Sequence, residues 1–190
     1  MKNSTLVIMA GGKSSRMQTD KALLPFKGYD SLAEYQYKRF QDDFFEIYIS
    51  AKNNKFNFHP QIVEDCHEDS SPLVALVSIF KSLDVEEVVV LSVDSPFINR
   101  EIFEKLLLER KDESVVIVAE SSNGLEPLCA IYRRGILGIA EVMLSKNQHR
   151  LQTLLESVKT QKVLFKDSKR FMNLNYPLEY ALAKVLSSNI

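Results

Sequence analysis

Glycines and cations gather just after the first apolar run of the sequence. Gly11 and Gly12 follow residues 5–9 directly, and Arg16 and Lys21 come next along the chain. Glycine lets backbone N–H groups approach an anion closely, because no Cβ intervenes. Arg16 can bind a phosphate through two nitrogens, and Lys21 supplies a mobile point charge. These residue types in this order predict a site for a polyphosphate.

Other known glycine patterns do not account for this segment. Gly12-Lys13-Ser14 matches the end of a P-loop, but that motif requires a glycine where Val7 stands. The dinucleotide-binding fingerprint fails as well, since no third glycine follows at the required offset. A plain surface turn would explain the two glycines but not the spacing of the cations.

An aspartate follows the most apolar run of the chain. Asp94 comes directly after residues 87–93, and Pro96 stops the strand expected there. A carboxylate at the carboxyl end of a buried parallel strand lies at the bottom of the ligand crevice. Hard oxygen ligands of this kind suit Mg²⁺, so we expect Asp94 to bind it. The alternative role for Asp94 is to cap the helix expected from Arg100, but Asn99 is better placed for that.

A second acidic pair follows a short extended segment. Glu64 and Asp65 come after Ile62 and Val63, and could add a carboxylate near the same edge of the sheet. Taken alone, these two residues are expected to be solvated loop charges.

The elements that must position these residues alternate along the chain. Short β-branched runs predict strands, and apolar residues at helical spacing predict helices. The expected strands are 5–9, 46–50, 61–63, 87–93, 114–119, 128–132 and 163–165, and the expected helices are 31–40, one from Pro72, 100–110, 135–144, 150–158 and 177–186. This alternation predicts a three-layer α/β fold, with a mostly parallel central sheet and helices on both faces.

Composition limits the classes of function. The 190 residues are 45% hydrophobic with a net charge of −1, which fits a single globular domain and gives no footprint for nucleic acid. Cys66 and Cys129 lie too far apart in the sequence to suggest a disulfide framework or a zinc site. No run has the length of a membrane span or a signal-peptide core. We therefore expect a cytoplasmic protein with no nucleic-acid or membrane partner.

The motif segments resemble the family of molybdenum cofactor guanylyltransferases. The run MAGGKSSRMQTDKALLP, residues 9–25, is similar to the signature loop of that family. The similarity continues at residues 62–65, 92–96 and 171–177, in the same order and over almost the whole chain. The loop pattern G-G-x-S-x-R-M alone is shared with nucleotidyltransferases for sugars, alcohols and cofactors. The residues that follow this loop, which include Lys21, and the late Asn-x-Asn-x-Pro segment narrow the resemblance to molybdenum cofactor guanylyltransferases.

The resemblance implies a Rossmann-like nucleotidyltransferase fold and a reaction. GMP would pass from GTP to the terminal phosphate of molybdenum-loaded molybdopterin, with pyrophosphate as the other product. It implies Mg²⁺ as cofactor, and transient contacts with other molybdenum cofactor proteins are compatible with it. The N-terminal half of the single domain, residues 1–190, would bind the nucleotide, and the C-terminal part would bind the pterin.

The resemblance also assigns roles to individual residues. Arg16 and Lys21 would neutralise charge during transfer, and Asp94 would bind both the nucleotide and the metal. Asn173 and Asn175 would lie on the pterin side, although Asn175 could instead cap the last helix. The nucleotide-binding positions carried over from the family are Met9, Ala10, Gly11, Gly12, Lys21, Ser50, Asp65 and Asp94.

The sequence departs from the family pattern at two places. Ser50 stands where the family usually has asparagine, and residues 71–75 replace both glycines of a G-P-L-A-G turn. These departures leave the identity of the nucleotide base and of the second substrate open. The alternatives are a cytidylyltransferase, or a nucleotidyltransferase for a sugar or alcohol phosphate. A cofactor-binding protein without catalysis is the alternative from another class. The combination of Arg16, Lys21 and Asp94 argues against such a carrier.

Overall fold

The computed structural model describes residues 1–11, 19–67 and 70–187, and it is built around one seven-stranded sheet. The strand order is β3-β2-β1-β4-β6-β5-β7. The strands are β1 (Thr5–Met9), β2 (Glu46–Ala51), β3 (Gln61–Glu64), β4 (Glu87–Ser92), β5 (Val116–Ser121), β6 (Gly124–Arg133) and β7 (Thr160–Leu164).

The sheet has a parallel part and a mixed part. Strands β3, β2, β1 and β4 are all parallel, and Leu6 of β1 pairs with Ile47 on one side and Val89 on the other. Beyond β4 lies β6, which is antiparallel to both β4 and β5, while β7 is parallel to β5. The prediction of a mostly parallel sheet is confirmed.

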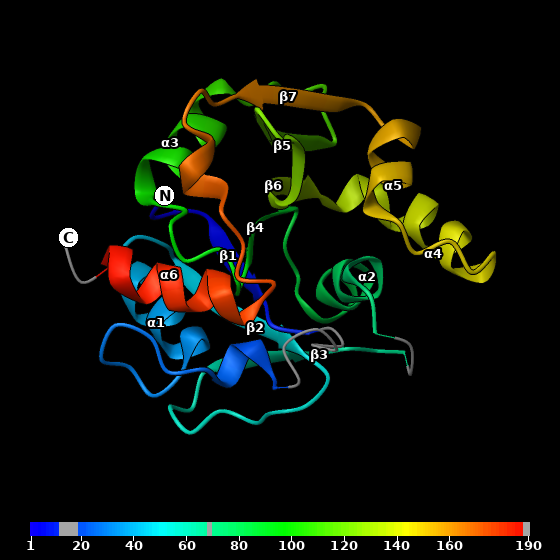
Figure 1. The fold of residues 1–190 in the computed structure, drawn as a ribbon. Coiled ribbons are helices and arrows are strands. Elements are labelled where there is room, and N and C mark those ends of the chain that lie inside the picture. Colours follow the sequence, from blue (N-terminus) through cyan, green and yellow to red (C-terminus); the bar gives the residue numbers. More distant parts are fainter. Residues whose placement is uncertain (12–18, 68–69, 188–190) are drawn as a thin grey trace.

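Helices cover both faces of the sheet, as expected. In Figure 1, α1 (Leu32–Phe40), α3 (Arg100–Glu109) and α6 (Pro177–Ser187) lie to the left of the sheet. On the right lie α2 (Pro72–Ser82), α4 (Leu137–Ser145) and α5 (Leu151–Ser157). Short 3-10 turns occur at Lys21–Leu23, Arg134–Ile136 and Ser168–Phe171.

Each face of the sheet has its own apolar core. Successive strand residues point to opposite faces, so Leu6 and Ile8 join one buried cluster while Val7 and Met9 join the other. All five residues of β1 are buried, which explains why its sequence is continuously apolar rather than alternating.

Side-chain caps set where the helices start. Ser31 accepts a hydrogen bond from the backbone of Glu34, so α1 begins at Leu32, one residue later than expected. Asn99 caps α3 in the same way, as the sequence predicted. Ser71 caps α2, whose first residue is Pro72. Such caps satisfy N–H groups that the first helical turn leaves without partners.

The mixed part of the sheet differs most from the sequence-based boundaries. Strand β6 begins at Gly124 rather than residue 128, and its pairing with β5 shifts between Val118 and Ala119. A glycine with φ of 113° starts this strand after a tight turn. Among the described residues, no helix combines the length and apolar character needed to cross a membrane.

Candidate active site

The carboxyl ends of the four parallel strands meet at one edge of the sheet. The ladder continues past the strand ends, because Ala10 N donates to Ser50 O at 2.9 Å and Val93 N donates to Met9 O at 3.0 Å. Asp65 N likewise donates to Ala51 O at 3.2 Å. These bonds bring the first-strand turn, Ser50, Asp65 and the segment before Asp94 to the same edge.

Lys21 and Asp94 form an ion pair at the centre of this edge. Lys21 Nζ lies 2.9 Å from Asp94 Oδ2, and the two side chains are only 15% and 16% exposed. The second carboxylate oxygen, Asp94 Oδ1, accepts from the Ser92 hydroxyl at 2.6 Å. The sequence predicted both charged residues, and the fold brings them into direct contact.

The position of Lys21 depends on a second ion pair behind it. Asp20 caps the turn that carries Lys21 by accepting from Ala22 N at 3.0 Å, and it also accepts from Lys55. Lys55 Nζ lies 3.4 Å from Ala10 O as well. Lys55 therefore ties the Lys21 turn to the end of β1, a role that the sequence did not reveal, since no motif contains this lysine.

A segment near the C-terminus completes the cluster. Asn175 Oδ1 accepts from Lys21 Nζ at 2.7 Å, across 154 residues of sequence. Leu174 N donates to Asp94 O at 2.9 Å, and Ser95 Oγ donates to Asn173 Oδ1. The side chain of Asn175 thus faces Lys21. Glu179 Oε2 instead accepts from the backbone N–H groups of Asn175 and Tyr176 at the start of α6.

Helix α1 supports the turn that carries Asp94. Gln36 is fully buried, and its amide nitrogen lies 3.1–3.3 Å from the carbonyl oxygens of Ser92, Val93 and Ser95. Arg39 Nη1 donates to Pro96 O at 2.6 Å, and its guanidinium lies over the Phe40 ring. Burial lowers the pKa of Arg39 to about 10, while Tyr35 opposes this shift. Sequence periodicity placed both residues on a helix but gave no sign of these contacts.

Two pockets lie on either side of Asp94. The first has a volume of about 130 Å³. Its lining includes Met9, Ala10, Gly11, Lys21, Asp65, the start of α2 and Asp94. The second has a volume of about 230 Å³ and is lined by Asp94, Glu126, Pro127, Cys129, Asn173 and Asn175, among others. Ser92, Asp94 and Leu128 line both pockets.

Asp65 is not the solvated loop charge that its local sequence indicated. It lines the first pocket, and its Oδ1 is buried without a hydrogen-bond partner in the described part of the chain. Ser50 Oγ is buried and unpaired in the same sense. Burial raises the pKa of Asp65, and the nearby Ser50 hydroxyl and Lys52 oppose that rise. The expectation was wrong because Asp65 N donates a hydrogen bond to Ala51 O of β2, which holds this residue at the edge of the sheet.

Gly11 lies beside Asp65 at a position where a methyl group would fit without a clash. A Cβ built on Gly11 would lie 3.6 Å from Asp65 Oδ2 and 3.8 Å from Ser70 Oγ, which are ordinary contact distances. Packing among the described residues therefore does not require glycine here, whereas close approach of a ligand would. Gly12 and Arg16, the other glycine and the first cation of the motif, lie outside the described residues.

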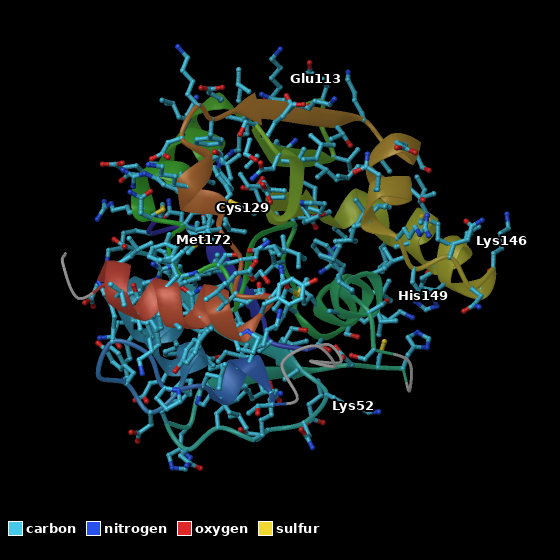
Figure 2. All side chains as sticks on the ribbon, in the orientation of Figure 1. Lys52, Glu113, Cys129, Lys146, His149 and Met172 are labelled. Carbon is cyan, nitrogen blue, oxygen red and sulfur yellow. The ribbon has the colours of Figure 1, made fainter. Side chains whose placement is uncertain are left out.

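The remaining sequence features have structural roles. Ser71, which replaces the first family glycine, caps α2, and its hydroxyl lies 3.0 Å from His149 Nδ1. Ala75, which replaces the second, lines the first pocket. Cys129 is buried and packed, as expected, and burial raises the pKa of its thiol. Figure 2 labels Cys129 in the middle of the molecule and His149 on the side of α4.

The donor set at Asp94 suits a magnesium ion shared with substrate. Within residues 1–11, 19–67 and 70–187, no three His, Cys, Asp or Glu side chains form a cluster that could hold a metal alone. Mg²⁺ commonly takes one or two carboxylates and completes its shell with substrate phosphates and water. Asp94, at a pocket that also contains Asp20 and Asp65, fits that pattern.

The fold is one that solved nucleotidyltransferases share. Solved structures of this fold include molybdopterin-guanine dinucleotide biosynthesis protein A from Archaeoglobus fulgidus, with a TM-score of 0.84 and 17% identity over 98% of this chain and 100% of that one. A crystal structure from Aquifex aeolicus VF5 has a TM-score of 0.78 and 31% identity, covering 90% of this chain and 93% of that one.

Sequence comparison narrows the class to a family. Residues 6–163 match the MobA-like NTP transferase domain. A molybdenum cofactor guanylyltransferase from Campylobacter jejuni is 36% identical over 92% of both chains. One from Helicobacter pylori strain G27 is 32% identical over 95% of this chain and 92% of its own. The chain belongs to the MobA-like NTP transferase family, in the group of molybdenum cofactor guanylyltransferases.

Proposed function

We propose that this protein transfers GMP from GTP to the terminal phosphate of molybdenum-loaded molybdopterin, giving the guanine dinucleotide cofactor and pyrophosphate. The observation that carries this proposal is the cluster of Lys21, Asp94 and Asn175 at the boundary of two pockets. A group transfer between two substrates requires both to reach one point from different sides. The names of the relatives supply the identity of the two substrates.

The reaction needs no protein nucleophile. An oxygen of the pterin phosphate forms a bond to the α-phosphorus of GTP, and the bond from that phosphorus to the bridging oxygen of the β-phosphate breaks. Pyrophosphate leaves with the electron pair. Catalysis is then mainly positioning of the reactants and stabilisation of charge.

Residues at and near the first pocket bind the nucleotide and stabilise charge on its phosphates. The backbone of Met9 to Gly11, with Gly12, binds the triphosphate, and Asp65, with Ser50 next to it, binds the nucleoside. Lys21 and Arg16 neutralise phosphate charge as it shifts toward pyrophosphate. Asn175 and Asp94 hold the ammonium of Lys21 in place between the two pockets.

Asp94 is the residue that would hold Mg²⁺. The bound ion supplies Lewis-acid polarisation of phosphate oxygens and a template for the reacting groups. Ser92 fixes one oxygen of Asp94, and the side-chain amide of Gln36 on α1 and the backbone N–H of Leu174 fix its turn.

The two pockets also support a division of the chain into halves. The first pocket is lined by residues between Met9 and Asp94, together with Leu128. The second is lined by residues between Ser92 and Asn175. We infer one nucleotidyltransferase domain, with its N-terminal half on the nucleotide and its C-terminal part on the pterin.

Pyrophosphate release with GTP, CTP, UTP and ATP tests this function. Each nucleotide is supplied with Mg²⁺ and molybdenum-loaded molybdopterin, to wild type, Asp94→Ala and the control Asp42→Ala. Asp42 is exposed in the turn after α1. We expect turnover mainly with GTP and a loss of about 100- to 1000-fold in Asp94→Ala, because charge stabilisation at the transferred phosphate is removed. The control should match wild type.

Each other outcome of the panel contradicts part of the proposal. Preference for CTP would move the protein to the cytidylyl branch and overturn the assignment of GTP. Full activity in Asp94→Ala would remove Asp94 from the mechanism. No turnover with any nucleotide, given intact pterin substrate, would favour a non-catalytic carrier.

A further inference from the structure

The second pocket contains a carboxylate that the transfer chemistry leaves without a role. Glu126 lines this pocket together with Asn173 and Asn175, which lie on its Asp94 side through their bonds to Ser95 and Lys21. These two asparagines lie where the phosphate end of the second substrate would bind. The organic part of that substrate must be recognised by other side chains of the same pocket.

An irregular pairing between β5 and β6 places Glu126 at the second pocket. On β5, Ala119 pairs with Glu126 while its neighbour Val118 pairs with Ala130, so residues 127–129 of β6 face no residue of β5. Pro127, which has no backbone N–H, begins this stretch. All three residues line the second pocket with Glu126, and Cys129 still pairs with Leu91 of β4 on the other side. Bulges of this kind re-aim side chains and are often found next to active sites.

One oxygen of Glu126 is held in a fixed direction. Ser121 Oγ accepts from Asn123 N at 3.0 Å, so its proton is directed to Glu126 Oε1, at 2.8 Å. The other oxygen, Oε2, has no hydrogen-bond partner among the described residues. Burial raises the pKa of Glu126, and the bond from Ser121 opposes this rise. A half-buried carboxylate with unused acceptor capacity lowers the stability of the free protein, and a ligand that donates to it restores those interactions.

The chemistry of a carboxylate selects a particular ligand edge. Two adjacent acceptor oxygens match two adjacent N–H donors, and each oxygen can accept more than one hydrogen bond. A pterin presents such a pair, namely the ring N–H of its pyrimidinone and the neighbouring 2-amino group. We propose that Glu126 binds the amino-pyrimidinone edge of the second substrate and so determines its specificity for a pterin. This inference rests on the proposed function, which supplies the pterin.

A matched pair of ligands tests this assignment directly. Lumazine differs from pterin in carrying oxygen in place of the 2-amino group, so it offers one donor and one acceptor at the same edge. A glutamine at position 126 also offers one acceptor and one donor. We would measure binding of a fluorescent pterin bearing a side-chain phosphate, and of the matching lumazine, to wild type and to Glu126→Gln.

The expected result is an exchange of preference. Wild type should bind the pterin at least about tenfold more tightly than the lumazine, since one hydrogen bond to a charged group is lost with the latter. Glu126→Gln should bind the lumazine at least as tightly as the pterin. Glu113→Gln is the matched control, because Glu113 is exposed at the opposite end of β5 and is labelled at the top of Figure 2. It should keep the wild-type ratio.

Two further measurements distinguish a failure of the role proposed for Glu126 from a failure of the proposed function. GTP binding should be unchanged in Glu126→Gln, and its KM for molybdenum-loaded molybdopterin should rise while GTP turnover remains detectable. An unchanged pterin-to-lumazine ratio in Glu126→Gln would overturn the role of Glu126, even with an active wild type. Inactivity of the wild type with intact pterin substrate would instead refute the proposed function. Ser121→Ala, which keeps the carboxylate, should retain the wild-type order of preference.

Discussion

The two pockets beside Asp94 are built in different ways. The first is formed by parallel strands whose carboxyl ends meet, and its residues come from segments that follow β1, β3 and β4 directly. The second is formed by an antiparallel strand with an irregular register and by a segment before the last helix. In the first, Gly11, Asp65 and Asp94 each come just after a recognisable strand. In the second, pairing far along the chain decides which side chains meet.

This difference between the pockets matches the chemistry of the two proposed substrates. A triphosphate is bound largely through backbone groups and cations, which a regular sheet edge with a glycine turn supplies. An organic ring requires particular side chains in a shaped cavity. In Figure 1 the segment before α6 passes in front of the sheet. Phe171, Asn173 and Asn175 of this segment line the second pocket.

Removal of Lys21 should produce the largest effect, because Lys21 lines the first pocket and contacts Asp94 and Asn175, which line the second. Lys21→Met keeps the length of the side chain but not its charge, and kcat should fall about 100- to 1000-fold. Lys146→Met is the control, since Lys146 is exposed at the end of α4, at the right of Figure 2. Steady-state kinetics with both substrates measures this. A fall in affinity for one substrate alone, with kcat retained, would show that Lys21 serves only one pocket.

A pair of milder variants should separate the pockets. Gly11→Ala places a Cβ on the wall of the first pocket, in contact with Asp65, so it should weaken GTP binding about 10- to 100-fold by displacing the phosphates. Asn173→Ala should raise the KM for the pterin substrate about tenfold, through loss of a hydrogen bond near its phosphate. Calorimetric titration of GTP and pterin-dependent kinetics give the two values. If both variants impaired the same substrate, the division between the pockets would be wrong.

Asp65→Asn should give the smallest effect, seen as a change of stability with pH. Burial raises the folded-state pKa of Asp65 above its ordinary value of 3.8, so the folded state binds this proton more tightly than the unfolded state. That contribution to stability is present below the ordinary pKa and is lost as pH rises through the folded value. Asp65→Asn should therefore melt above wild type at neutral pH, with the difference vanishing in acid.

The same variant should bind GTP more weakly, which connects stability with function. Thermal melts between pH 3 and pH 8, with Asp42→Asn as the exposed control, measure the first effect, and GTP titration measures the second. Equal melting temperatures for Asp65→Asn and wild type at every pH would contradict the burial argument. Unchanged GTP binding would remove Asp65 from the nucleotide site.

Prediction from sequence worked best in the parallel half of the sheet. The limits of β1 agree with the expected residues, and those of β2, β3 and β4 differ by one residue at their ends. Buried parallel strands are continuously apolar, so their limits are sharp in the sequence. The limits of β5, β6 and β7 were less accurate: β6 and β7 are partly exposed and so lack a continuous apolar pattern, and the pairing of β5 with β6 is irregular. Local sequence also misplaced Asp65, whose burial comes from a bond to a neighbouring strand.

By itself, the sequence determined the strand–helix alternation, the helix cap at Asn99 and the positions of Gly11 directly after β1 and Asp94 directly after β4. These features depend on residues close together in the chain, where periodicity and backbone chemistry act directly. Only the tertiary structure decided that Lys21 contacts Asn175, that Gln36 holds the Asp94 turn and that Glu126 enters the second pocket. Those contacts join segments distant in sequence, and strand pairing and helix packing alone determine which of them meet.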